Sequence, residues 1–341
     1  MAESGARASS EGPRGRAPSG VSEFIGKVLD QLSLTSWMPA AMLVGIGAIL
    51  VQFYAQATPS LVGAVANLTT NAVGVAVVLL FAVVLGAVVT QAFSFETIRF
   101  LEGYWGLARL TRPVMQARTG AHARRREGLS AQVEQHRTRA FEVARSAMWA
   151  DRIPVAYIEV LEDDFYDQPE GTRRAHEPAV TRSARQMGWR PKASPADLAT
   201  LERLERRLGE YPARHRVLPT RLGNVIRAAE DALERDGHEL EGLIMRNYDV
   251  IPTRLMVQHD QFRDRLDMYC TLVPVFALLA LGYASLLLRG QLFISTATLS
   301  ALGCVALAIV SYQAAIASAR GYGAALSAIA SRVAEKQAQP A

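Results

Sequence analysis

Hydrophobic residues gather in four long segments that form two pairs, one on each side of a polar central region. The segments are Met38–Ala57, Ala72–Phe93, Cys270–Leu288 and Ile294–Ala319. Each can cross roughly 30 Å of hydrocarbon as a helix, which takes about 20 apolar residues. Between Met38 and Phe93 the chain has no Asp, Glu, Lys or Arg, whereas a helix of a water-soluble core would carry a polar face. The pattern therefore predicts a mainly α, four-helix transmembrane protein.

The polar central region predicts a predominantly helical cytoplasmic domain between the second and third transmembrane helices. The leader is rich in Ser, Gly, Pro, Ala and Arg and cannot bury enough apolar surface to order itself. The next residues place charged side chains opposite apolar ones at helical spacing, as in a helix lying on a membrane surface. The expected division is a disordered leader (1–20), an amphipathic interfacial helix (21–36), a transmembrane hairpin (37–93), the cytoplasmic domain (94–268), a second hairpin (269–319) and a cytoplasmic tail (320–341).

Positive charge predicts the orientation. The connection 58–71 carries no charged residue and the turn 289–292 carries only Arg289, whereas arginines and lysines flank the other ends of the four segments. Cytoplasmic loops hold the excess of Lys and Arg, so both termini and the central domain are expected in the cytoplasm. Of 37 basic residues only Lys27, Lys192 and Lys336 are lysines, a bias typical of a high-GC bacterium. The expected location is the bacterial plasma membrane, with several passes.

Apolar spacing also predicts elements in the first half of the central domain. Steps of three and four continue from Phe95 to Leu110, which predicts that the second transmembrane helix extends into the cytosol. The arginine run Arg124–Arg126 is interpreted as the far end of that extension, and Val133–Ala150 as the next helix.

The second half of the central domain is divided by Pro and Gly. Val155–Leu161 is interpreted as a strand, and the charged, Pro-rich stretch 163–192 as a loop or insertion. Ser194 and Pro195 then have the pattern of an N-cap and first helical residue, with Gly209 closing that helix.

One hexapeptide pattern occurs twice, at Val217–Leu222 and at Val250–Leu255. Each copy predicts a helix start with Thr as N-cap and Pro before it. The first copy begins the run Leu-Pro-Thr-Arg-Leu-Gly-Asn, which ends at Asn224. With Tyr211-Pro212 before it and Arg227–Asp231 after it, this run resembles a motif in uncharacterised multi-pass membrane proteins of actinobacteria.

The resemblance covers roughly the last third of the central domain and the entry to the third span. Where the motif continues with Tyr-Gly-Leu-Asp and Trp-Pro-Arg-Leu, this chain has Gly-His-Glu-Leu at 237–240 and Met-Arg-Asn-Tyr at 245–248. The resemblance implies a multi-pass architecture and no particular activity.

Three residues of this region are candidate ligand-binding residues: Arg221, Asn224 and Arg227. Exposed amides and the macrodipole at a helix N-terminus favour negative charge, so an anionic ligand fits there. The alternative is a structural cap with solvated arginines.

No metal site, cofactor or catalytic group is expected. The six histidines are scattered without ligand spacing, and the two cysteines, Cys270 and Cys304, lie inside predicted spans. The acidic residues between Glu159 and Glu170 can hold a divalent cation or pair with nearby arginines, and the spacing of a calcium loop is missing. Gly223 with Asn224 lacks the further glycines of a phosphate loop.

These features predict a non-enzymatic integral membrane scaffold or signalling protein. The alternative is a ligand-gated pore or membrane effector with a cytoplasmic sensor domain, and an enzyme acting on lipid or nucleotide would need a catalytic constellation that is not found. Expected partners are anionic lipid headgroups and an unknown cytoplasmic protein, with a homo-oligomer left open. The net charge of +5 is modest, so no nucleic-acid partner is expected.

Overall fold

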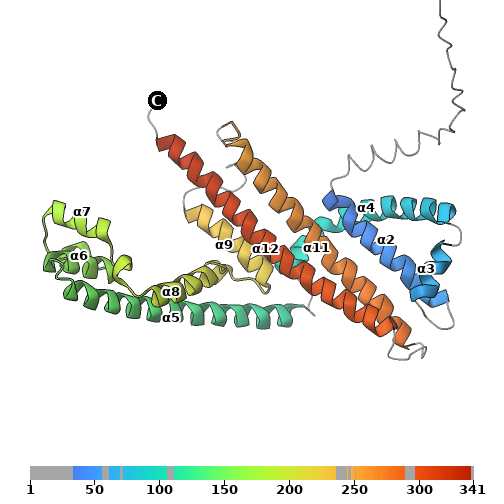
Figure 1. Ribbon diagram of the computed structural model, residues 1–341, viewed down its shortest axis with the longest axis horizontal. Coiled ribbons are helices and arrows are strands. Elements are labelled where there is room, and N and C mark those ends of the chain that lie inside the picture. The colour runs from blue at the N-terminus through green and yellow to red at the C-terminus, as the bar shows by residue number, and fades with distance from the viewer. Residues whose placement is uncertain are drawn as a thin grey trace, which may run out of the picture. The chain divides into compact units, whose positions relative to one another are not determined.

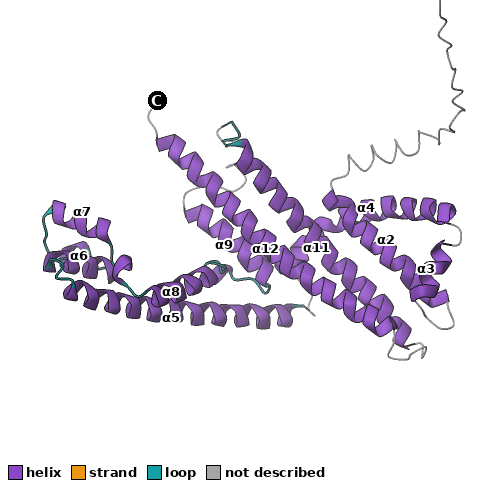
Figure 2. Cartoon of the chain, viewed as in Figure 1, coloured by secondary structure: helices purple, strands orange, loops and turns teal. Residues whose placement is uncertain are grey.

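A computed structural model describes residues 34–55, 61–69, 72–105, 111–235, 244, 247–249, 251–288 and 296–338 (Figure 1). These residues form helices joined by loops and short 3₁₀ turns, and no strand occurs among them (Figure 2). The helices are α2 (Leu34–Ala55), α3 (Leu61–Thr69), α4 (Ala72–Glu102), α5 (Arg112–Ala150), α6 (Val155–Phe165), α7 (Pro178–Met187), α8 (Pro195–Leu208), α9 (Arg221–Arg235), α11 (Thr253–Leu288) and α12 (Thr296–Ala338). The expected leader 1–20 and most of the interfacial helix 21–36 lie outside the described residues.

Four helices are long and apolar enough to cross a membrane, which confirms the predicted fold class. The spans are Trp37–Ala55 in α2, Gly74–Glu102 in α4, Thr253–Leu286 in α11 and Ala297–Lys336 in α12. Many large apolar side chains of α4 and α12 are exposed in the isolated chain, among them Phe81, Leu85, Leu299 and Leu302. Patches of this kind are rare on proteins dissolved in water and suit contact with lipid.

The chain divides into two compact units. Unit 1 contains residues 1–94 and 271–310, and unit 2 contains residues 95–270 and 311–341. Among the described residues, every Asp, Glu, Lys, Arg and His belongs to unit 2. The chain passes from one unit to the other inside α4, α11 and α12. A unit whose described residues carry no charge and a charged unit are therefore built on the same three helices.

Unit 1 pairs its buried polar groups internally. The Tyr283 hydroxyl donates to the Ile46 carbonyl oxygen of α2 at 3.2 Å, and the hydroxyls of Tyr54 and Ser285 share a hydrogen bond. The Tyr283 ring also packs edge-on against Phe53, with centroids 5.9 Å apart. Because hydrocarbon offers no hydrogen-bond partners, these contacts satisfy groups that would otherwise be costly in a membrane.

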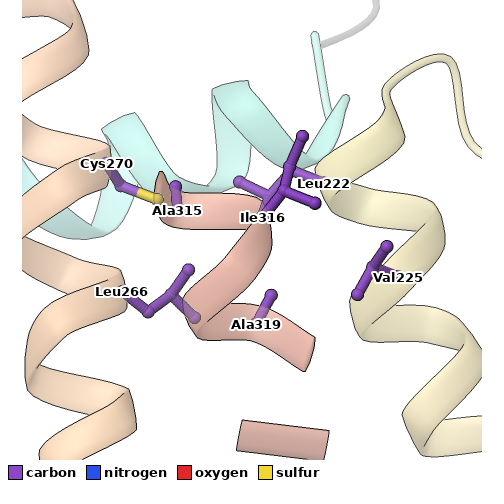
Figure 3. Packing of buried hydrophobic residues seen from close by; sticks show 7 residues of the cluster. All are labelled: Leu222, Val225, Leu266, Cys270, Ala315, Ile316 and Ala319. Atoms are coloured by element: carbon purple, nitrogen blue, oxygen red, sulfur yellow. The ribbon is translucent and has the colours of Figure 1, made fainter. Parts of the chain in front are cut away.

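The main core of unit 2 joins α9, α11 and α12. Its buried residues are Leu222, Val225, Leu266, Cys270, Ala315, Ile316 and Ala319 (Figure 3). The small side chains Ala315 and Ala319 of α12 are fully buried and let the neighbouring helices approach closely. A second cluster around Leu233, Leu326 and Ile329 continues the packing of α9 on α12. These contacts place the start of α9, which carries the candidate ligand residues.

The remaining part of unit 2 is organised along α5. Helix α8 packs on α5, and α7 packs on α6. Phe141 of α5 is fully buried and stacks on Phe165 with centroids 3.9 Å apart, while Trp189 meets both rings edge-on. Phe141 therefore makes both stacked and edge-on contacts, the two geometries that aromatic pairs prefer. Because Phe165 belongs to α6, this cluster holds α6 on α5.

The predicted end of a helix at Arg124–Arg126 is wrong, because α5 runs without interruption from Arg112 to Ala150. Arginine is a good helix former, and no proline interrupts this stretch. Arg118 and Arg126 donate to the carbonyl oxygens of Pro219 and Pro212, at 3.2 and 2.8 Å. The basic residues therefore hold a neighbouring loop on α5 rather than ending the helix.

The predicted strand at Val155–Leu161 is also wrong, because these residues begin α6. Pro154 occupies the N-cap, and Ile158, Leu161 and Phe165 recur at helical spacing and are buried. The stretch 163–192, interpreted as a loop, contains the end of α6 and the whole of α7, which starts with Pro178 at its first position. The helix bounds expected from Ser194, Pro195 and Gly209 are confirmed by α8.

Helix α4 extends past the apolar segment but ends at Glu102, before the predicted Leu110. Gly103 follows with φ of 105°, and the Tyr104 and Gly103 amides donate to the Arg99 and Phe100 carbonyl oxygens at 2.9 and 3.1 Å. This is a Schellman end, which needs a residue that tolerates positive φ. Residues 106–110 lie outside the described part of the chain.

Candidate functional site

The start of α9 is fastened to the end of α4 by Thr220. Its hydroxyl donates to the Glu102 carbonyl oxygen at 2.7 Å and accepts the Gly223 amide at 3.1 Å. The first bond satisfies one of the carbonyls left open at a helix C-terminus, and the second caps α9. The predicted N-cap role of Thr220 is confirmed. In the second copy of the hexapeptide, α11 already begins at Thr253, which is exposed.

Two glycines permit this close approach. A Cβ on Gly103 would lie 2.6 Å from the Pro219 ring, and a Cβ on Gly223 would overlap the Glu102 carbonyl and lie 2.9 Å from a Leu218 methyl group. Real side chains do not occupy such positions, so only glycine fits at either place. The Gly-Asn pair of the motif thus serves helix packing.

Asn224 is 1% exposed and acts as a clamp on the preceding loop. Its side-chain oxygen accepts the Leu218 amide at 2.8 Å, and its amide donates to the Leu218 and Thr220 carbonyl oxygens at 3.0 and 2.8 Å. These three bonds use most of the capacity of the side chain. Asn224 orders the loop and is not presented to a ligand.

Arg227 contacts a different set of residues from Arg221. Its guanidinium donates to the Tyr104 hydroxyl at 3.2 Å and lies 3.7 Å from a Glu230 carboxylate oxygen. It also lies over the Tyr104 ring, 5.7 Å from the centroid. Arg227 therefore joins α9 to the residues after α4, and it does not converge with Arg221.

Arg221 is exposed, unlike the buried or half-buried residues of the Leu218–Asn224 motif around it. It lines a pocket of about 220 Å³ between α5, the end of α8 and the start of α9. The other lining residues are His122, Arg125, Leu129, Arg207, Glu210 and Tyr211. Of the three candidate residues, Arg221 alone reaches this pocket.

The pocket carries an excess of positive charge. Glu210 is its single carboxylate, and it is bound by Arg221 at 3.1 Å and by Arg320 of α12 at 2.7 Å. Burial, followed by the charges of Arg118, Arg125 and Arg221, lowers the pKa of His122 below its ordinary value. Its Nδ1 lies 3.4 Å from the Tyr211 hydroxyl. The pocket therefore disfavours a further positive charge and favours an anion.

A second pocket of about 400 Å³ lies on the other side of Tyr211 and is lined by Arg126, Arg216 and Asp231 among others. Its arginines are already engaged. Arg216 pairs with Asp231 at 2.7 Å, and Arg126 donates to the Pro212 carbonyl oxygen at 2.8 Å. This pocket has less unsatisfied charge to offer a ligand.

The acidic stretch around α6 pairs with arginines. Arg185 contacts Asp164 through two nitrogens at 2.8 and 2.9 Å, and Arg174 reaches Glu162 at 3.1 Å. The hydrogen bond from Arg185 lowers the pKa of Asp164 below its ordinary value, against the opposing effect of burial. Within the described residues no group of three His, Cys, Asp or Glu side chains is placed to hold a metal ion.

The residues that sequence reasoning missed are Arg125, Arg207 and His122. They come from two different helices, and each looks like an ordinary solvated side chain in its own segment. They lie beside Arg221 only because α8 packs on α5 and the start of α9 lines the same pocket. No local pattern could have identified them.

Comparison of the chain with protein-family models, with curated proteins and with solved structures finds no match. The pocket and the junction are therefore interpreted from their own chemistry.

Replacement of Gly223 by Ala should open the junction between α4 and α9. The new methyl group would overlap the Glu102 carbonyl, and overpacking of this kind costs about 1–3 kcal/mol. Hydrogen exchange of the full-length protein in detergent should show faster exchange at the start of α9. The control is Gly128→Ala on α5, where a Cβ meets nothing within 4 Å and should be neutral or slightly stabilising. Equal exchange in both variants would contradict the tight approach.

His122 should make the stability of the protein pH-dependent. Its pKa in the folded protein lies below the ordinary value of 6.5, so the unfolded chain binds the proton more readily, and stability falls as pH drops through and below that value. Arg118, Arg125, Arg221 and Tyr211 face the ring. Between about pH 7.5 and about pH 5.5, thermal unfolding midpoints should fall less for His122→Gln than for the parent. An equal fall of the unfolding midpoint in both proteins would show that His122 does not contribute to the pH dependence of stability.

Proposed function

We propose that this protein is a non-enzymatic integral membrane scaffold or signalling protein of a bacterial plasma membrane, with unit 2 and both termini in the cytoplasm. The observation that carries the proposal is the separation of charge between two units that share three helices. The described residues of unit 1 carry no charge and expose apolar side chains, which suits lipid, whereas the charged unit 2 suits water. The resemblance of the Leu218–Asn224 motif to actinobacterial multi-pass membrane proteins supports the same proposal.

Orientation rests on where the basic residues lie. Arg99 lies in the last turn of α4 and Arg112 begins α5, Arg263 and Arg265 lie in the unit 2 part of α11, and further basic residues lie in the unit 2 part of α12. Such residues next to the membrane face anionic headgroups on the cytoplasmic side. Anionic lipids are therefore the first proposed partners, together with a cytoplasmic protein that unit 2 would bind.

A signalling or scaffolding role is favoured over a pore. Ion-coupled transport through a bilayer depends on ionisable groups at membrane depth, and the described residues of unit 1 include no Asp, Glu, Lys, Arg or His. Because the chain enters unit 2 inside α4, α11 and α12, a change in unit 2 can be passed along helices rather than lost in a flexible linker.

Cysteine labelling tests the proposed orientation. Ser130 on α5 is exposed, and Val62 on α3 is 82% exposed. A membrane-impermeant maleimide should label Ser130→Cys only in inside-out vesicles and Val62→Cys only in right-side-out vesicles. The parent, whose two cysteines are buried, sets the background. Labelling of Ser130→Cys from the outside would reverse the orientation.

Flux measurements separate a scaffold from a pore. Liposomes that contain the purified protein should release ions and small dyes no faster than protein-free liposomes, because the uncharged helices of unit 1 offer no polar path. Liposomes with a pore-forming peptide provide the positive control. Release above background, with or without added small anions, would overturn the scaffold proposal in favour of a gated pore.

A further inference from the structure

We propose that the pocket lined by Arg125, Arg207 and Arg221 binds the phosphate group of a phosphate monoester. This inference deepens the proposed signalling role, since the ligand would be what unit 2 senses. The binding chemistry itself concerns unit 2 alone and does not require a particular orientation in the membrane.

The charges of the pocket match a dianion. Three guanidinium groups and one carboxylate line it, so two positive charges are in excess with His122 neutral. Within the described part of the chain, the side chains of Arg125 and Arg207 make no hydrogen bond or ion pair, and both are exposed at the pocket rim. They are available to a ligand, unlike Arg118 and Arg126, which hold backbone carbonyls.

The number of guanidinium groups around the pocket favours a phosphate monoester over a carboxylate. A guanidinium presents parallel donors that fit two phosphate oxygens, and three such groups can serve the three terminal oxygens of a monoester. The pocket volume of about 220 Å³ is smaller than that of most sites for drug-sized ligands. The Tyr211 hydroxyl and the His122 ring add neutral polar groups beside the arginines.

Glu210 is a built-in competitor for the ligand. In the free protein it occupies Arg221 at 3.1 Å and Arg320 at 2.7 Å. A phosphate that draws Arg221 to itself would leave Glu210 paired with Arg320 of α12. Neutralising Glu210 should therefore strengthen binding, because it frees Arg221 and removes a negative charge from the pocket.

Calorimetric titration with glycerol phosphate tests the site in the full-length protein, held in nanodiscs of zwitterionic lipid at constant ionic strength. The parent should bind saturably. Arg125→Ala and Arg207→Ala should each weaken binding about tenfold or more, since each removes a charge-assisted contact. The matched controls are Arg124→Ala on α5 and Arg203→Ala on α8, which remove the same charge outside the pocket and should change affinity less than about twofold.

Glu210→Gln should bind several-fold more tightly than the parent, with its thermal midpoint checked in parallel. Absence of saturable binding, equal losses in the controls, or weaker binding by a folded Glu210→Gln variant would each overturn the proposal. Failure of the flux or labelling tests would leave this result unaffected, so the two proposals fail separately.

A phosphate monoester can belong to a soluble molecule or to a lipid headgroup. Nanodiscs that contain phosphatidic acid distinguish these sources. Loss of glycerol phosphate binding in such discs, restored when phosphatidylglycerol replaces phosphatidic acid, would assign the site to a lipid headgroup. Unchanged binding in both discs would assign it to a soluble phosphate ester.

Discussion

The hydrogen bond from the Thr220 hydroxyl to the Glu102 carbonyl oxygen fixes the arrangement on which the rest of unit 2 depends. It joins the last turn of α4 to the first turn of α9, and the missing side chain of Gly223 is what allows the two backbones to meet. Asn224 holds the loop before α9 in place, and within the Leu218–Asn224 motif Arg221 is the residue that remains exposed. The position of that one arginine, and with it one wall of the basic pocket, follows from a hydrogen bond between a side-chain hydroxyl and a backbone carbonyl.

This constraint explains why most of the Leu-Pro-Thr-Arg-Leu-Gly-Asn motif is structural. Pro219 packs on Gly103, Thr220 caps the helix, Leu222 fills the core and Asn224 orders the loop. Each of these residues makes contacts that stabilise the fold. A motif can therefore look like a ligand fingerprint although its residues, with the exception of Arg221, turn inward.

Sequence reasoning found the features that depend on composition and on neighbouring residues. The four membrane-length helices follow from long uncharged segments, and the start of α8 and the cap at Thr220 follow from local side-chain chemistry. It failed at Val155–Leu161, because a short, mainly apolar run fits either a strand or a helix and only packing on Met148 decides. It failed at Arg124–Arg126, because a run of three charged residues was interpreted as the end of a helix, although arginine is a good helix former.

The pocket could not be predicted from the sequence for a different reason. Arg221 was found through its motif, but Arg125 and Arg207 are far from each other in the chain, and neither is unusual on its own helix. Tertiary packing brings these arginines together. Their counter-charge also depends on tertiary structure, because Glu210 pairs with Arg320 of α12 as well as with Arg221. The carboxylate that balances the pocket therefore also pairs with a helix whose first part belongs to unit 1. A group that competes with Glu210 for Arg221 would leave the carboxylate to Arg320 alone, so ligand binding in the pocket would alter a contact of α12 as well.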